Sequence, residues 1–312
     1  MRILEEKSAA AVELKNVLCA TDFSEASEAA LRYVTALSLR YGSVIHLAHI
    51  LADVTLLRPG APDPAVIGSI YEDAHSGAQE KMQRLTDRLK GFPHAAYIRH
   101  GETCQVLAEL VGEQQIDLLI TGTHGRTGLS KLVLGSVAEE ILRQVRCPVL
   151  TVGPKAVGTV VPDSPRDREL PPAQINIRQV LYATDFKQES QEAFRYALSF
   201  AREFRARLAV LHVIETYGDQ PYEHPGPIDN SLSRLRELVP DGAGLRHPPE
   251  ILAEFGSPSD CILQTAADRE VDLIVLGARP AAGHLGTATH FGRAVAHKVI
   301  VGAHCPVLTV RN

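Results

Sequence analysis

The chain has 312 residues, enough for two domains of about 150. A formal net charge of -5 disfavours nonspecific nucleic-acid binding, which depends on clustered Lys and Arg. No apolar run reaches the roughly 18 residues of a membrane span, and residues 1–15 carry three glutamates rather than the apolar core of a signal peptide, so the sequence favours the cytoplasm. The five cysteines include no CxxC pair, which predicts buried free thiols.

The first half predicts alternating strands and helices. Short apolar runs indicate strands, and apolar residues at helical spacing indicate helices. Ser24 is the predicted N-cap of the first helix. In chain order we expect strand 16–20, a helix from 24, strand 44–51, a helix to about 90, strand 95–99, helix 106–111, strand 116–121, helix 136–144 and strand 149–152.

The second half repeats the first. Residues 16–51 and 179–214 align without a gap and share 11 of 36 positions, including an Ala-Thr-Asp-Phe run. The segments 116–122 and 271–277 are similar, and both halves close with CPVLTV. The Pro-rich stretch between them is typical of an exposed linker. We therefore expect domains at 1–156 and 177–312, joined by a linker at 157–176.

Each domain is predicted to be a doubly wound, Rossmann-like parallel sheet. The strand at 116–121 is almost wholly apolar, as in parallel sheets covered by helices on both faces. Ligands of such sheets bind beyond the carboxyl ends of the strands, where the strand order reverses.

A glycine-rich loop follows the strand that ends near residue 121. Glycines at 122, 125, 128 and 135 let the backbone approach an anion, and the helix that begins at Ser136 adds free N–H groups. Arg126 and Lys131 add positive charge. Ser136 and Glu139 also fit a capping box, which needs no ligand. The Walker and dinucleotide motifs are both missing.

Asp22 lies just beyond the first strand, on the same edge of the predicted sheet as the loop. Because a carboxylate repels phosphates, Asp22 should face the nucleoside end of a ligand or hold a divalent ion. The alternative is that Asp22, like Asp185 in the second half, only assists the cap of the following helix.

These motifs together resemble the universal stress protein family, over nearly all of both halves. The family's spacing of Gly, two residues, Gly, nine residues, Gly and Ser or Thr is met by Gly122, Gly125, Gly135 and Ser136. The resemblance implies a tandem universal stress protein, with domains of the adenine nucleotide alpha hydrolase-like fold, that binds ATP, with or without Mg²⁺, in its first domain. It implies that the CPVLTV strands pair the two domains with each other, and it leaves a homodimer open. The nucleotide-binding residues it implies are Ala20, Thr21, Asp22, Ile50, Thr121, Gly122, Thr123, His124, Gly125, Arg126, Gly128, Gly135, Ser136, Val137 and Ala138.

The second half departs from that pattern. Asp185, Val213 and Gly277 remain, but Pro280 replaces the next glycine and has no N–H. Counted back from Cys305, the positions of Gly135 and Ser136 become Arg293 and Ala294, with Gly292 one place away. We therefore expect the second half to bind ATP weakly or not at all. Four histidines, at 284, 290, 297 and 304, fit a solvated surface better than a zinc site.

Three functions fit these residues. The first is an ATP-binding stress or regulatory protein whose output is a nucleotide-dependent change in conformation or partner binding. The second is a slow ATPase or autophosphorylating enzyme, although no general base is evident beside the loop. The third is a nucleotide-free interaction scaffold. No catalytic or metal-binding residue is assigned.

Overall fold

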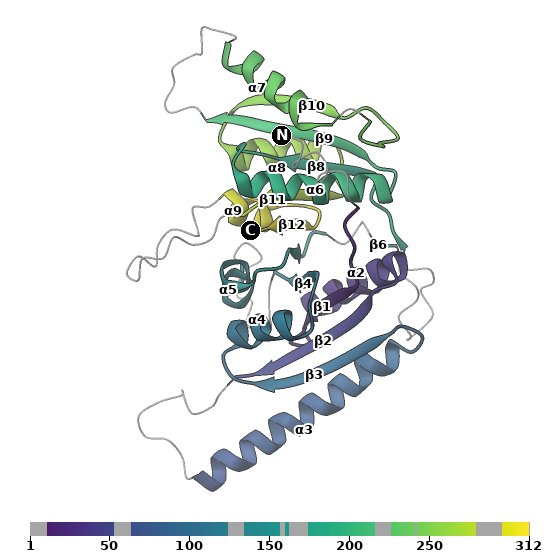
Figure 1. The fold of residues 1–312 in the computed structure, drawn as a ribbon. Coiled ribbons are helices and arrows are strands. Elements are labelled where there is room, and N and C mark those ends of the chain that lie inside the picture. Colours follow the sequence, from purple (N-terminus) through teal and green to yellow (C-terminus); the bar gives the residue numbers. More distant parts are fainter. Residues whose placement is uncertain are drawn as a thin grey trace.

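The computed structural model describes residues 11–52, 64–123, 134–156, 160–161, 174–215, 226–240, 242–278 and 295–311. Figure 1 shows two α/β halves joined through their sheets, with helices on either side. The predicted α/β class and the tandem repeat are confirmed. Among the described residues, no helix combines the length and the apolarity needed to cross a bilayer.

The first half alternates strands and helices in the predicted order. Its elements are β1 (Asn16–Ala20), α2 (Glu25–Tyr41), β2 (Val44–Leu51), α3 (Pro64–Arg88), β3 (His94–His100), α4 (Thr103–Glu113), β4 (Leu118–Gly122), α5 (Ser136–Gln144) and β5 (Val149–Val152). The strands lie in the order β3-β2-β1-β4-β5 and all pair in parallel. The order reverses between β1 and β4, which is where such sheets bind ligands.

The second half repeats this topology. Its elements are β8 (Gln179–Ala183), α6 (Gln188–Glu203), β9 (Arg207–Glu215), α7 (Gly226–Leu238), β10 (Glu250–Gly256), α8 (Pro258–Asp268), β11 (Leu273–Gly277), α9 (Val295–Gly302) and β12 (Val307–Val310). The strands lie in the order β10-β9-β8-β11-β12, again in parallel. The corresponding reversal lies between β8 and β11.

The two closing strands join the halves into one ten-stranded sheet. β12 pairs antiparallel with β5, with Leu308 opposite Leu150. The expected pairing of the CPVLTV strands within one chain is therefore confirmed. Helices α2 and α6 meet on the same face, where Arg40 forms an ion pair with Glu203 over 2.6 Å.

Both faces of the sheet are buried. Successive strand residues point to opposite faces, so Val17 and Cys19 pack under α2, while Leu18 packs on the side of α4 and α5. Each apolar cluster runs through both halves, one beneath α2, α3, α6 and α7 and the other beneath α4, α5, α8 and α9. This explains why the central strands read as continuous apolar runs.

The segment expected to be a plain linker contains a small paired element. β6 (Val160–Val161) pairs antiparallel with β7 (Gln174–Ile175), and Ile175 packs against the core beneath α2. Just before it, the buried Ala156 accepts a hydrogen bond from the Tyr33 hydroxyl over 2.7 Å. The two ends of this segment are therefore held together beside the first half.

Candidate functional site

The candidate nucleoside-side residues lie at the carboxyl ends of neighbouring strands. Ala20 ends β1, and Thr21 and Asp22 follow it. Ile50 lies near the end of β2, which pairs directly with β1. On the other side of β1, Thr121 and Gly122 end β4. The topology thus brings predicted residues far apart in the sequence to one edge of the sheet.

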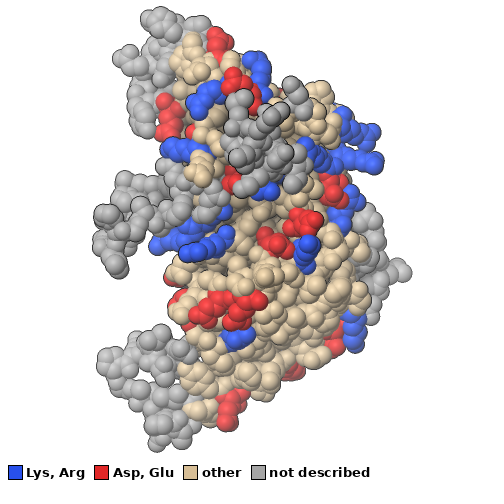
Figure 2. Space-filling model, in the orientation of Figure 1, with Lys and Arg blue, Asp and Glu red and all other residues tan. Residues whose placement is uncertain are grey.

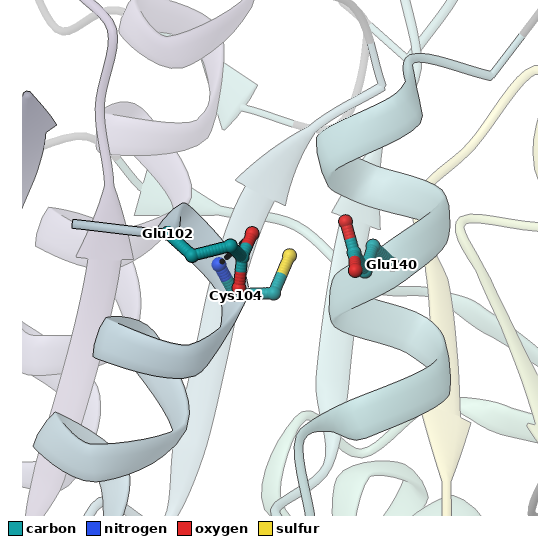
Figure 3. Close-up of side chains that lie close together, drawn as sticks. All are labelled: Glu102, Cys104 and Glu140. Atoms are coloured by element: carbon teal, nitrogen blue, oxygen red, sulfur yellow. Dashed lines mark hydrogen bonds between the residues drawn. The ribbon is translucent and has the colours of Figure 1, made fainter. Parts of the chain in front are cut away.

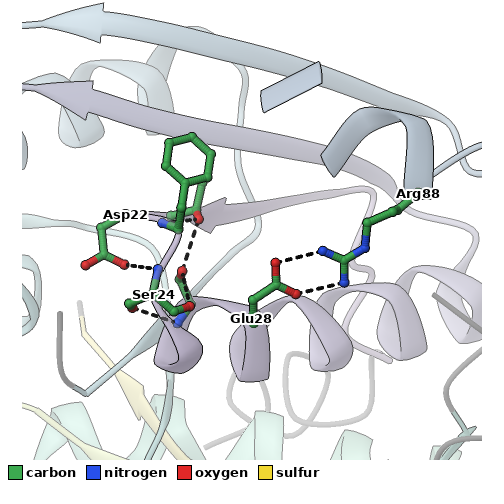
Figure 4. Close-up of polar contacts among 7 residues, drawn as sticks. Asp22, Ser24, Glu28 and Arg88 are labelled. Carbon is green, nitrogen blue, oxygen red and sulfur yellow. Dashed lines mark hydrogen bonds and ion pairs between the residues drawn. The ribbon is translucent and has the colours of Figure 1, made fainter. Parts of the chain in front are cut away.

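The turn from β1 into α2 is built by its own polar side chains (Figure 4). Thr21 Oγ1 accepts from the amide of Phe23, and Asp22 Oδ1 accepts from the amide of Ser24, both over 3.0 Å. Phe23 adopts a left-handed φ of 62°, and Ser24 caps α2 by accepting from the amide of Ser27. The expected N-cap is confirmed, and Asp22 does brace the cap, as the alternative interpretation predicted.

His49 fixes the end of β2 against this turn. Its Nδ1 lies 2.7 Å from the backbone carbonyl oxygen of Thr21, so Nδ1 carries the proton and donates. The ring also packs 4.4 Å from that of Phe23. In the second half, His212 makes the same contacts with Thr184 and Phe186, over 2.8 Å and 4.4 Å. The repeated histidine in the sequence is the signal for this positioning role.

Arg88 braces α2 from the neighbouring helix. The guanidinium makes two hydrogen bonds to the Glu28 carboxylate, of 2.7 and 2.8 Å (Figure 4). A bidentate interaction of this kind fixes the orientation of the two side chains in addition to pairing their charges. It ties the C-terminal end of α3 to the helix that begins beside Asp22.

The base of the glycine loop is closed by backbone hydrogen bonds. The amide of Thr123 donates to Val152 over 3.1 Å, and the amide of Gly135 donates to the carbonyl of Thr123 over 2.8 Å. Both amides are therefore engaged within the protein. The predicted residues His124, Gly125, Arg126 and Gly128 lie outside the described residues, as does Lys131.

Helix α5 begins one residue earlier than a capping box requires. Gly135 is the N-cap, with an extended backbone (φ -63°, ψ 146°), and Ser136 is the first helical residue. Among the described residues no side chain caps this helix, and Ser136 is not its N-cap, so the capping-box interpretation of Ser136 and Glu139 is wrong. The amides of Ser136, Val137 and Ala138 occupy the first turn, where an α-helix supplies no acceptor of its own. Ser136 and Val137 are exposed, and Ala138 is buried.

A buried thiol contacts the first turn of α5 from α4 (Figure 3). Cys104 Sγ donates to the backbone carbonyl of Val137 over 3.7 Å. Burial raises the pKa of this thiol to about 12, and the nearby carboxylates of Glu140 and Glu102 add to the shift. Glu102 caps α4 by accepting from the amides of Cys104 and Gln105. Sequence reasoning treated Cys104 only as a buried thiol and missed this contact.

Acidic side chains gather beside the site. Figure 2 shows them over α4 and α5, the helices whose sequences include Glu109, Glu113, Glu139 and Glu140. Glu139 is partly balanced by Arg143, 2.9 Å away one turn later. A negatively charged ligand at the start of α5 would therefore meet both the helix dipole and nearby carboxylates.

The second half has the same turn with different side-chain partners. Asp185 Oδ1 accepts from the amide of Lys187 over 3.0 Å and from the hydroxyl of Ser190 over 2.7 Å. The ammonium of Lys187 lies 3.6 Å from the same carboxylate. In the first half the residue aligned with Ser190 is Ser27, whose hydroxyl donates to the carbonyl of Ser24 instead.

The rest of the second site is only partly described. Val213 lies in β9 and Gly277 ends β11, at the positions of Ile50 and Gly122. Ala278 donates to Val310 over 2.8 Å, as Thr123 does to Val152. The altered loop, with Pro280, His284, His290, Gly292, Arg293 and Ala294, lies outside the described residues.

Comparison with known proteins gives one family for both halves. The sequence model of the universal stress protein family matches residues 13–153 and 176–311. A universal stress protein of Mycolicibacterium smegmatis is 24% identical over 95% of this chain and 96% of its own length. One from Methanocaldococcus jannaschii is 28% identical over 155 residues, which is 45% of this chain and 96% of that protein. The crystal structure of a universal stress protein from Archaeoglobus fulgidus has a TM-score of 0.69 at 20% identity, covering 95% of this chain and 98% of that one.

Proposed function

The chain belongs to the universal stress protein family, and on that basis we propose that it is a nucleotide-dependent regulatory protein that holds ATP with Mg²⁺ in its first half. The main support for this proposal is the arrangement of strand ends in the first half. Asp22, Ile50 and Gly122 lie at the carboxyl ends of three adjacent strands, beside the point where the strand order reverses. The hydrogen bond from Gly135 to Thr123 brings the start of α5 to the same edge.

The two ends of this edge suit different parts of a nucleotide. The nucleoside would lie against Ala20, Thr21, Asp22 and Ile50, where a carboxylate can accept from hydroxyl or amino groups. The phosphates would lie at the first turn of α5, where the amides of Ser136, Val137 and Ala138 and the helix dipole favour an anion. Thr121 and Gly122 join the two ends, and the loop residues His124, Gly125, Arg126 and Gly128 would complete the phosphate side.

The surrounding charge supports a magnesium complex rather than free ATP. Glu139 and Glu140 lie within the first two turns of α5. These carboxylates repel an uncompensated triphosphate, and a divalent cation would offset part of that charge. We therefore expect Mg²⁺ to tighten ATP binding to this chain.

The second half would then be the partner-binding or structural half. Its Asp185 is engaged by Ser190 and Lys187, so recruiting this carboxylate to a ligand would break existing contacts. Pro280 further removes an amide from the loop. Nucleotide in the first half would bias the conformation of the whole chain, because the halves share one sheet.

Binding calorimetry with Mg-ATP on the full chain tests the proposal. Asp22→Asn should weaken binding about tenfold, and Gly125→Pro, which copies the residue of the second half, should weaken it at least as much. Asp185→Asn is the matched control and should leave the affinity unchanged. A wild-type chain that binds no ATP, or one that loses binding only through Asp185→Asn, contradicts the proposal. Rapid phosphate release that Asp22→Asn abolishes would favour an ATPase instead.

A further inference from the structure

Two histidine side chains meet between α3 and β3. Nδ1 of His75 lies 3.3 Å from Nε2 of His100. The ring planes differ by only 13°, and the ring centroids are 5.5 Å apart. In a neutral pair one nitrogen donates and the other accepts, so the two ring nitrogens face each other. The chain thus places two potential metal ligands in contact from two separate elements.

The separation of these nitrogens suits a zinc ion. Two imidazole nitrogens bound to one tetrahedral Zn²⁺ at ~2.0–2.1 Å lie about 3.3 Å apart. The observed N···N distance already equals that edge. To aim both lone pairs at the ion, each ring would turn by about 35°, which the broad χ2 of histidine permits. Each ring would then carry its proton on its other nitrogen.

The surroundings allow an ion to reach the pair. His100 is exposed at the end of β3, and His75 is half-buried on α3. Tyr71, one turn before His75, packs its ring 5.9 Å from that of His100 and supports it from one side. The nearest basic residue in sequence, Arg99, forms an ion pair with Glu113 over 3.2 Å.

We propose that His75 and His100 form a surface site for a divalent transition metal of the Zn²⁺ class, with water completing the coordination. The ion would join α3 to the edge strand of the sheet. His100 pairs in register with Leu51, so the ion would lie at the carboxyl end of β3. The metal site rests on its own two ligands and does not depend on nucleotide binding.

Calorimetric titration of the full chain with Zn²⁺ alone tests the site. Because the chain has 13 histidines, the measured quantity is the difference between variants rather than total zinc. His75→Gln and His100→Gln should each weaken one zinc site at least tenfold. The double variant should lose no more than either single variant, because either change destroys the pair. His94→Gln, an exposed histidine on the same strand, is the control and should bind zinc as the wild type does.

A second measurement uses the wild-type chain, so it tests the site even if the variants fail to fold. In the wild-type chain, the imidazole NMR signals of His75 and His100 should shift together at one equivalent of Zn²⁺, and those of His94 should stay in place. Zinc binding that both single variants retain at full strength overturns the site. So does an NMR titration in which the two rings do not respond.

Discussion

Gly122 lies so close to Ala26, in the first turn of α2, that a β-carbon on Gly122 would be 2.7 Å from the backbone oxygen of Ala26 and 2.8 Å from its carbonyl carbon. The contact is with backbone, which cannot swing aside as a side-chain end can. This glycine is therefore required by the packing of α2 on β4, whatever ligand lies beyond it.

Gly122→Ala is expected to lower the free energy of unfolding by about 2 kcal/mol, since overpacking of a closed contact typically costs ~1–3 kcal/mol. Urea unfolding of the nucleotide-free chain measures the effect. Gly112→Ala is the matched control, because that glycine lies in α4 with nothing within 4 Å of the added carbon. The control should be neutral or stabilise the helix slightly. Equal unfolding curves for Gly122→Ala and wild type would refute the packing argument.

Ser136→Ala separates a ligand role from a capping role. Because Ser136 is the first helical residue and does not cap α5, its loss should leave the stability of the nucleotide-free chain unchanged. If its hydroxyl binds a phosphate, affinity for Mg-ATP should fall about fivefold to tenfold, which corresponds to ~1 kcal/mol for one hydrogen bond.

Ser24→Ala provides the opposite control for that experiment. Ser24 does cap α2, so its loss should cost about 1 kcal/mol of stability without nucleotide. A similar stability loss in Ser136→Ala would restore the capping-box interpretation of the α5 terminus. Thermal unfolding and calorimetry on the same preparations give both quantities.

Thr151 and Thr309 occupy equivalent positions in the two closing strands but differ in hydrogen bonding. Thr309 Oγ1 donates to the carbonyl of Val149 over 3.2 Å, whereas the buried Thr151 Oγ1 has no partner in the part of the chain that the structure describes. Thr151→Val should therefore raise the free energy of unfolding, and Thr309→Val should lower it, each by about 1 kcal/mol. Urea unfolding of both variants checks the signs. Shifts of the same sign would mean that the two strand positions are equivalent in solution.

How well the sequence predicts the bounds of a helix or strand depends on which interactions stabilise that element. Strands 16–20 and 44–51 were predicted with the observed bounds, because both are apolar runs that end at polar turns. Helix α4 extends beyond the predicted 106–111, since its first turn is capped by Glu102 rather than marked by an apolar residue. The β6–β7 pair was not predicted, because two-residue strands leave no periodic signal.

The features of the candidate site also differ in how well the sequence predicts them. The positions of Asp22 and Gly122 followed from strand ends, which local sequence reveals. The donation of the Thr123 amide to Val152 and of the Gly135 amide to Thr123 depends on tertiary packing, and no residue type in the sequence indicates it. The contact of His75 with His100 joins a helix to a strand 25 residues later, so only the packing of α3 on β3 brings it about.

His46 supplies a pH-dependent prediction. Its Nδ1 lies 3.1 Å from the Tyr97 hydroxyl and its Nε2 lies 3.2 Å from Asn16 Oδ1. Neutral His46 satisfies both contacts, with Nε2 donating to Asn16 and Nδ1 accepting from Tyr97. Burial lowers the pKa of His46 below its usual 6.5, because the charged ring is poorly solvated there.

The direction of the pH dependence follows from the linkage between proton binding and folding. A histidine whose pKa is lowered by folding stabilises the native state above pH 6.5, and this contribution is lost as the pH falls through the lowered pKa. Wild type should therefore lose more stability between pH 7 and pH 5 than His46→Gln does. His94→Gln, which removes an exposed ring from β3, should keep the wild-type slope. Urea unfolding at the two pH values gives the slopes, and NMR titration of the His46 ring gives its pKa. A ring that titrates at or above 6.5, or equal slopes for wild type and His46→Gln, would contradict this account of the buried imidazole.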